Sequence, residues 1–160
     1  MYMKVNPVGR ILSEVQRAYL AGLMDGDGAI MACIEPHKEK RFKFRIRVSL
    51  KITLSSKADI EWIRNLTGVG YVRKNQRTFE WVVRDRSETK WMLKMLRHYF
   101  HSKNKQAKIA LRILDSSVDT AKALYQVACL ADTLSSFNVR SKSRRRNFAT
   151  MIPRVFPVTT

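Results

Sequence analysis

Residues 20–28 read Leu20-Ala-Gly-Leu-Met-Asp-Gly-Asp-Gly28. They close a stretch with helical spacing of apolar residues, which Ser13-Glu-Val-Gln16 opens with the pattern of a capping box. Small side chains, which let two helix backbones approach closely, share one face of this expected helix: Ala18, Ala21, Gly22 and Gly26. Two acids and the carbonyl groups of the last turn follow, and both are hard oxygen ligands that suit Mg²⁺. The stretch therefore predicts a helix with a close-packing face that ends at a candidate cation site.

Residues 42–53 alternate between apolar and polar side chains, which predicts a strand buried on one face. The apolar face consists of Phe42, Phe44, Ile46, Val48, Leu50 and Ile52, and the opposite face of Lys43, Arg45, Arg47, Ser49, Lys51 and Thr53. This polar face carries four cations and no acid. A solvated outer face normally mixes both signs, so the bias favours a surface that faces nucleic acid, with a plain solvated face as the alternative.

The rest of the chain predicts three further strands and several helices. Strands are expected at 29–34, 71–74 and 78–84, and helices at 58–66, 87–100, 105–114 and 118–134. The order favours an α+β fold with a four-stranded antiparallel sheet, helices on one face and a basic face on the other. We expect Trp62, Trp81 and Trp91 in the core. Residues 1–160 are expected to form a single domain, with a core over about 10–137 and a basic segment over 138–160.

The composition points to a polyanionic partner. Among 160 residues, 31 are Lys or Arg and 13 are Asp or Glu, which gives a net charge of +18. On a compact domain this favours nucleic acid over a membrane surface. No apolar run approaches the roughly 18 residues of a membrane span, and Cys33 and Cys129 lie in apolar contexts typical of buried thiols in a reducing compartment. We therefore expect an intracellular protein, in a prokaryotic cytoplasm or an organelle, with no membrane association and no organic cofactor.

The stretch 20–28 resembles the motif of the LAGLIDADG homing endonucleases and matches it at seven of nine positions. The exchanges are Met24 for Ile and Gly26 for Ala. The succession of elements and the basic strand also fit that family, and Gly68-Val-Gly-Tyr-Val-Arg73 and Lys103-Asn-Lys-Gln-Ala107 look like segments of its single-motif, algal-type members. The similarity spans roughly residues 10–147.

The resemblance implies a homodimer joined through the motif helices, with Ala18, Ala21, Gly22 and Asp25 at the interface. It makes Asp27 the metal ligand and the Gly26 carbonyl a helper ligand, while Asp25 would brace the turn. Lys103 and Ser56 align with peripheral catalytic positions, although serine is shorter than the residue usual in the family. Mg²⁺ is the implied cofactor; Mn²⁺ is expected to substitute, and Ca²⁺ to bind without supporting cleavage.

Double-stranded DNA is the implied partner. The residues expected to contact it are Lys38, Arg41, Lys43, Arg45, Arg47, Ser49, Lys51, Thr53, Arg73, Lys74, Arg77, Arg140, Lys142 and Arg144. The function implied is that of an intron-encoded, site-specific endonuclease that hydrolyses both strands of a long pseudo-palindromic site. The alternative is a nucleic-acid-binding protein without cleavage, such as an RNA maturase or a DNA-binding regulator. A basic ribosome-associated protein would leave the motif unexplained.

Overall fold

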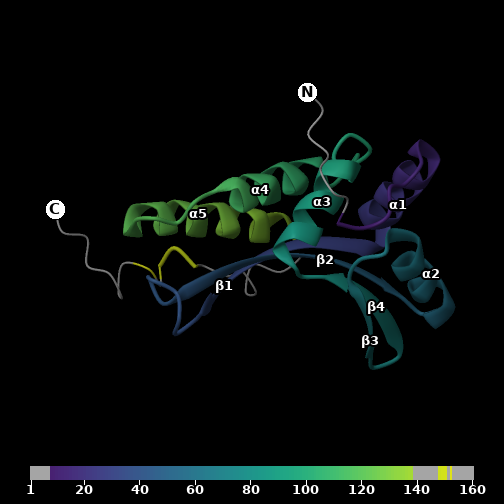
Figure 1. Ribbon diagram of the computed structural model, residues 1–160, viewed down its shortest axis with the longest axis horizontal. Coiled ribbons are helices and arrows are strands. Elements are labelled where there is room, and N and C mark those ends of the chain that lie inside the picture. Colours follow the sequence, from purple (N-terminus) through teal and green to yellow (C-terminus); the bar gives the residue numbers. More distant parts are fainter. Residues whose placement is uncertain (1–7, 139–147, 151, 153–160) are drawn as a thin grey trace. The chain divides into compact units, whose positions relative to one another are not determined.

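The computed structural model describes residues 8–138, 148–150 and 152. The elements, labelled in Figure 1, are α1 (Glu14–Asp27), β1 (Gly28–Pro36), β2 (Phe44–Leu54), α2 (Lys57–Thr67), β3 (Tyr71–Asn75), β4 (Thr78–Val83), α3 (Arg86–Leu96), α4 (Asn104–Asp115) and α5 (Ala121–Asn138). Arg140, Lys142 and Arg144 lie outside the described residues. No helix in the described ranges is long and apolar enough to cross a bilayer.

The strands form the expected four-stranded antiparallel sheet, in the order β1-β2-β4-β3. β4 lies between β2 and β3 and runs antiparallel to both. The period-two pattern predicted for β2 is confirmed over residues 48–52, because Val48, Leu50 and Ile52 are all buried. Ile52 stands directly opposite Trp81 of β4, which is fully buried. One face of the sheet is therefore core, and the polar residues of β2 occupy the other.

Helix α1 begins and ends where the sequence predicted. The Ser13 hydroxyl accepts the backbone N–H of Gln16, and the Gln16 side chain accepts the N–H of Ser13, which completes the capping box. Leu20 and Met24 are buried and anchor the helix. Gly28 ends it, and its N–H donates to the carbonyl of Met24. The motif therefore occupies the last two turns of a helix that leads directly into β1.

The described residues form two compact units, and β2 contributes to both. The first unit comprises the residues up to Ala29 together with Ser49–Lys103. In it, α1 packs against α3, and α2 packs against the β3–β4 hairpin. The second unit comprises Ile30–Val48 and the residues from Asn104 onward. There α4 and α5 run side by side (Figure 1), and the side chain of Asn138 at the end of α5 donates to the carbonyl of Ile30 in β1.

Several local expectations were wrong: α3 ends at Leu96 and not at residue 100, and α5 covers Ala121–Asn138 and not 118–134. β2 begins at Phe44 and not at residue 42, because the backbone turns at Lys43, whose φ is +61°. β1 runs two residues further than predicted, to Pro36. Trp62 is not a core residue, since 48% of it is exposed; its ring makes an edge-to-face contact with Tyr19, at 5.7 Å between centroids.

Gly28 provides a test of this helix-to-strand junction. A Cβ at Gly28 would lie 2.7 Å from both the Cα and the carbonyl oxygen of Met24, so Gly28→Ala must displace backbone. We expect the free energy of unfolding, measured by urea denaturation, to fall by about 1–3 kcal/mol. Gly26→Ala is the matched control, because a Cβ there meets no atom within 4 Å. Equal losses in the two variants would contradict the steric account.

Candidate functional site

The exposed end of α1 presents one carboxylate without a partner. Asp27 is exposed, and within the described part of the chain no hydrogen bond or ion pair involves its side chain. Gly26, one residue earlier, is also exposed, and space is open around it. A carboxylate and a nearby backbone carbonyl suit Mg²⁺, which normally takes few protein ligands and fills its octahedron with water and phosphate oxygens. The residues present therefore fit a divalent cation that is completed by other groups.

Asp25 is held differently, because its carboxylate binds the chain just before α4. One oxygen accepts the backbone N–H of His101 at 2.8 Å and the other that of Lys103 at 2.9 Å. Burial alone would raise the pKa of Asp25, but these hydrogen bonds and those from Ser102 lower it below its usual value. Asp25 thus braces the turn, as the sequence indicated. It links the end of α1 to His101 and Lys103, which lie 76 and 78 positions further along the chain.

Lys103 lies beside the motif. Its ammonium group donates to the backbone carbonyl of Asp25 at 2.7 Å, two residues before Asp27. The structure therefore binds Lys103 to the residue that directly precedes Gly26 and Asp27 in the chain. Ser56 is not joined to them by a hydrogen bond among the described residues: it caps α2, and its hydroxyl accepts the N–H of Asp59 at 3.2 Å. Its catalytic role stays a prediction.

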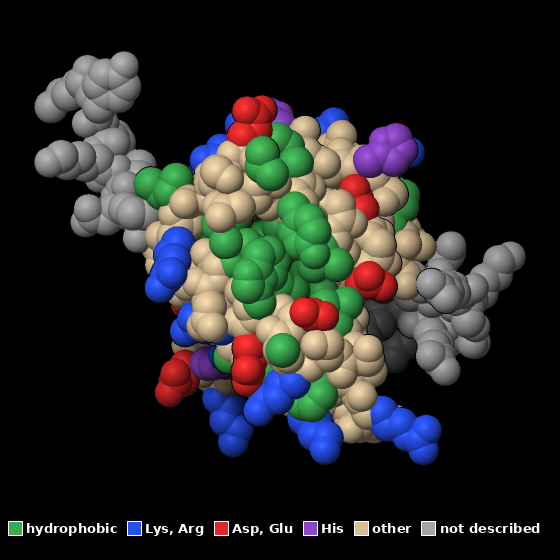
Figure 2. All heavy atoms as spheres, turned by 90° about the vertical axis from the view of Figure 1, so that its right-hand side faces the viewer, with side chains coloured by type: hydrophobic (Ala, Val, Ile, Leu, Met, Phe, Trp, Pro, Cys, Tyr) green, Lys and Arg blue, Asp and Glu red, His purple; other side chains and the backbone are tan. Residues whose placement is uncertain are grey.

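The small-residue face of α1 is open, with one correction. Ala18, Gly22 and Gly26 are exposed, and a Cβ at either glycine would meet no atom within 4 Å. Ala21 was expected on the same face but is fully buried, because it points into the protomer's own core beside Leu20 and Met24. Figure 2 shows an apolar patch on the side where α1 and α2 lie. Large exposed apolar side chains of α1, of α2 and of the segment before α1 include Ile11, Val15, Tyr19 and Trp62.

The basic face of the sheet contains acids that the β2 pattern did not reveal. In the second unit, Glu35 of β1 pairs with Arg45 at 2.9 Å and approaches Arg47 at 3.8 Å. The pKa of Glu35 is lowered, chiefly by the hydrogen bond from Arg45. Cys33, on the same face of β1, also contacts Glu35. This cationic surface is therefore partly neutralised by the protein itself.

In the first unit, Glu80 of β4 plays the corresponding part. Its carboxylate is approached by Lys51 at 3.1 Å and by Arg73 at 2.6 Å, and its side chain is only 1% exposed. Asn75 and Thr53 also donate to it, at 3.1 and 3.4 Å. Burial opposes ionisation, but the hydrogen bonds from Arg73, Lys51 and Asn75 outweigh it and lower the pKa of Glu80 to about 2.

The sequence contained a signal for Glu80. Thr78, Glu80 and Val82 alternate with Phe79, Trp81 and Val83, so a period-two reading of β4 places Glu80 opposite the core face. What it does not reveal is the register, which sets Glu80 directly across from both Thr53 and Arg73.

The remaining predicted contact residues lie in turns or on strands. Lys38, Arg41 and Lys43 belong to the turn between β1 and β2, where the ammonium group of Lys43 donates to the carbonyl of Lys38 at 2.8 Å. Lys74 and Arg77 are exposed on the β3–β4 hairpin, and Ser49 is half-buried on β2. Contacts of these residues with DNA stay predictions.

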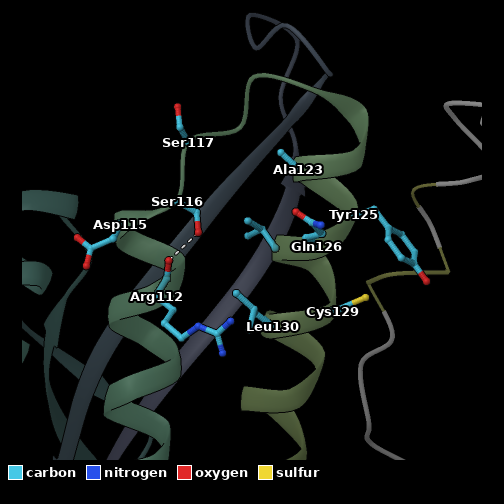
Figure 3. A pocket seen from close by; sticks show the side chains of 10 residues that line it. Arg112, Asp115, Ser116, Ser117, Ala123, Tyr125, Gln126, Cys129 and Leu130 are labelled. Atoms are coloured by element: carbon cyan, nitrogen blue, oxygen red, sulfur yellow. Dashed lines mark hydrogen bonds between the residues drawn. The ribbon is translucent and has the colours of Figure 1, made fainter.

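Two other features lie apart from this site. No group of three His, Cys, Asp or Glu side chains in the described ranges could hold a metal ion, and His98 accepts a hydrogen bond from Arg97 instead. A hollow of about 710 Å³ lies between the end of α4 and the start of α5 in the second unit (Figure 3). Tyr125 and Cys129 of α5 and Arg112 of α4 line it. The sequence singled out only Cys129, as a buried thiol, and the structure leaves both Cys129 and Cys33 partly exposed.

Comparison with known proteins agrees with this geometry. The family model described as LAGLIDADG endonuclease matches residues 20–113. DNA endonuclease I-CvuI of Chlorella vulgaris is 32% identical over 74% of this chain and 77% of its own, and DNA endonuclease I-CreI of Chlamydomonas reinhardtii is 28% identical over 83% and 84%. A crystal structure of I-CvuI with the I-CreI target superposes with a TM-score of 0.78, at 28% identity, over 88% of this chain and 94% of that one.

An archaeal intron-encoded homing endonuclease, I-Vdi141I, solved in complex with DNA, shares the fold, with a TM-score of 0.76 at 17% identity over 89% of this chain and 97% of that one. The chain belongs to the LAGLIDADG endonuclease family, as its motif indicated.

The pKa of Glu80 gives a pH-dependent prediction. Because its folded-state value lies below the ordinary 4.5, ionised Glu80 stabilises the fold above pH 4.5, and this stabilisation is lost as the pH falls towards 2. At about 1.4 kcal/mol per pH unit, the effect is at most about 3–4 kcal/mol. We expect the stability difference between wild type and Glu80→Gln to shrink over this range in urea titrations at fixed protein concentration. A difference independent of pH would contradict the ion-pair account.

Proposed function

We propose that this chain is a site-specific, Mg²⁺-dependent DNA endonuclease that acts as a homodimer, encoded within a mobile intron, and cuts both strands of a long pseudo-palindromic site. The observation that carries the proposal is the end of α1, where Asp27 is exposed and has no partner among the described residues, while the Lys103 ammonium group is bound to the carbonyl of Asp25 two residues earlier. A DNA substrate places the enzyme inside the cell, in a prokaryotic cytoplasm or an organelle.

Asp27 and the carbonyl of Gly26 would hold the cation. A bound Mg²⁺ supplies an activated water and stabilises the leaving oxygen of the phosphodiester. Asp25 keeps the turn in place, so that the Asp27 carboxylate faces outward from a rigid helix end. The ammonium group of Lys103 lies near this turn, where a cation offsets phosphate charge as it develops. Structures of I-CvuI with DNA in the presence of Mg²⁺, in which the I-CreI target is not cleaved, and in the presence of Ca²⁺ support the choice of a divalent cation.

A second copy of the chain would complete the site. One protomer contributes one carboxylate, whereas cleavage of two strands needs two such centres. The exposed small residues of α1 allow a close helix crossing, and the apolar patch around Tyr19 and Trp62 offers further surface to bury. A twofold dimer implies a pseudo-palindromic site, because the symmetry of the protein and of its target must match.

The polar face of the sheet would read the DNA. β-ribbons fit the major groove, where Arg recognises guanine and Ser or Thr tolerates several bases. Arg45, Arg47, Lys51 and Arg73 lie on this face, with a net charge of +18 for the whole chain to attract the phosphates. DNA complexes of I-CvuI and I-Vdi141I support this partner.

Asp27→Asn tests the catalytic assignment. We expect it to abolish cleavage and to leave DNA binding nearly unchanged, because it removes a metal ligand and not a DNA anchor. The assay incubates wild type and variant with a randomised duplex library, in Mg²⁺ or in EDTA, and sequences both the ends and the bound fraction.

Discrete ends at one pseudo-palindromic sequence, from wild type with Mg²⁺ alone, would establish the endonuclease. Enrichment of a bound sequence without any cleaved ends would instead indicate a DNA-binding protein without cleavage. The absence of both cleaved ends and enrichment would point to structured RNA as the ligand, as in a maturase. Loss of binding in Asp27→Asn would mean that this residue is structural.

Gly22→Leu tests the dimer. Its side chain projects from the open face of α1, so it blocks a close helix crossing without a clash inside the protomer. We expect light scattering to report a monomer that has lost cleavage but keeps wild-type helix content by circular dichroism. Ser87→Leu, at an exposed position of α3, is the control and stays dimeric. A Gly22→Leu protein that remains a dimer would exclude this interface.

A further inference from the structure

Glu80 is the only Asp, Glu, Lys or Arg among the buried residues of the described chain. It lies on the face of the sheet that the proposed function assigns to DNA, and it carries a charge opposite to the one such a face needs. Burial of an ionised side chain is costly unless hydrogen bonds and counter-ions satisfy it. Its place in the sheet therefore calls for an explanation other than affinity for phosphate.

The position of β4 between β2 and β3 explains how Glu80 is satisfied. The register sets Thr53 and Arg73 directly across from it on the two neighbouring strands, and Lys51 lies two residues before Thr53 on β2. Asn75, two residues after Arg73 on β3, reaches the same carboxylate. One side chain thus gathers donors from both of its neighbouring strands.

These partners occupy Oε1 of Glu80 fully and Oε2 in part. Oε1 accepts from Lys51, Asn75 and Thr53, and Oε2 accepts from Arg73 at 2.6 Å. Oε2 keeps one lone pair, but a carboxylate that is only 1% exposed is out of reach of a base. The donors, in contrast, keep capacity: Arg73 uses Nε, which leaves its two terminal nitrogen atoms for a bidentate contact, and Lys51 keeps two further N–H groups.

We propose that Glu80 is a positioning residue for DNA-sequence discrimination, which fixes Lys51, Arg73 and Asn75 so that each presents its remaining hydrogen-bonding groups in one orientation. The inference rests on the proposed function. A Lys or Arg side chain that moves freely binds any phosphate within reach. A donor that is fixed in one orientation contributes binding energy only where the facing base edge matches it. Glu80 therefore lowers the electrostatic attraction of this face for DNA of any sequence, and it increases the difference in affinity between sequences.

The test uses two variants of Glu80 that separate position from charge. Glu80→Gln removes the charge at nearly constant shape, and Glu80→Asp keeps the charge but shortens the reach by one methylene. Glu35→Gln is the matched control, since it removes the same charge from the same face at a half-exposed pair. Binding is measured by competition in Ca²⁺ at fixed salt, against the site found by library selection and a scrambled duplex.

We expect the ratio of specific to non-specific affinity to fall about tenfold or more in both Glu80 variants and less than threefold in Glu35→Gln. The loss should concentrate at a few base pairs when single-base variants of the site are compared. Circular dichroism checks that each protein is folded, and Glu80→Asp, which keeps its charge for Lys51 and Arg73, carries the test if Glu80→Gln fails to fold.

Equal losses in Glu80→Gln and Glu35→Gln would overturn the inference, because net charge alone would then account for the effect. An unchanged ratio in Glu80→Asp would also overturn it, since position would not matter. If wild type itself shows no preference for any sequence, the proposed function fails instead, and this result is read before any variant is compared.

Discussion

The hydrogen bonds of Asp25 hold the candidate active site together. Its carboxylate accepts backbone N–H groups from residues 101 and 103, and its own carbonyl accepts the ammonium group of Lys103. One residue at the end of α1 therefore fixes a segment 76 to 78 positions further along the chain. Because Asp25 is occupied in this way, the next acid, Asp27, is the one left open. The two acids of the motif differ in role through their partners and not through their chemistry.

Local sequence signals predicted most of the elements. The capping box at Ser13 and the period-two pattern of Val48, Leu50 and Ile52 depend on neighbours close in the chain, and both agree with the structure. The motif also led to the correct family. The start of β2 was misjudged, because the apolar–polar alternation extends back through Lys43, where the positive φ marks a turn.

The features that the sequence did not predict depend on tertiary contacts. Whether a tryptophan is covered depends on the elements around it, so Trp62 was placed in the core although its only ring contact, within the described chain, is with Tyr19 at the surface. Ala21 was assigned to an open face because small size alone does not distinguish a core position from an interface. The counter-ions of the basic face were missed for a similar reason, since the register of β4 against β2 and β3 is a long-range property.

The place of β3 at the edge of the sheet has a consequence for the solubility of the protein. An edge strand exposes unpaired backbone groups, and it invites another strand to add unless charged side chains discourage the approach. β3 is largely exposed, and Arg73 and Lys74 stand on it. The cations assigned to DNA would then also guard this edge against aggregation. A redesign that replaces them with apolar residues to change the target would remove that protection, so retargeting of this strand is constrained by colloidal stability as well as by base recognition.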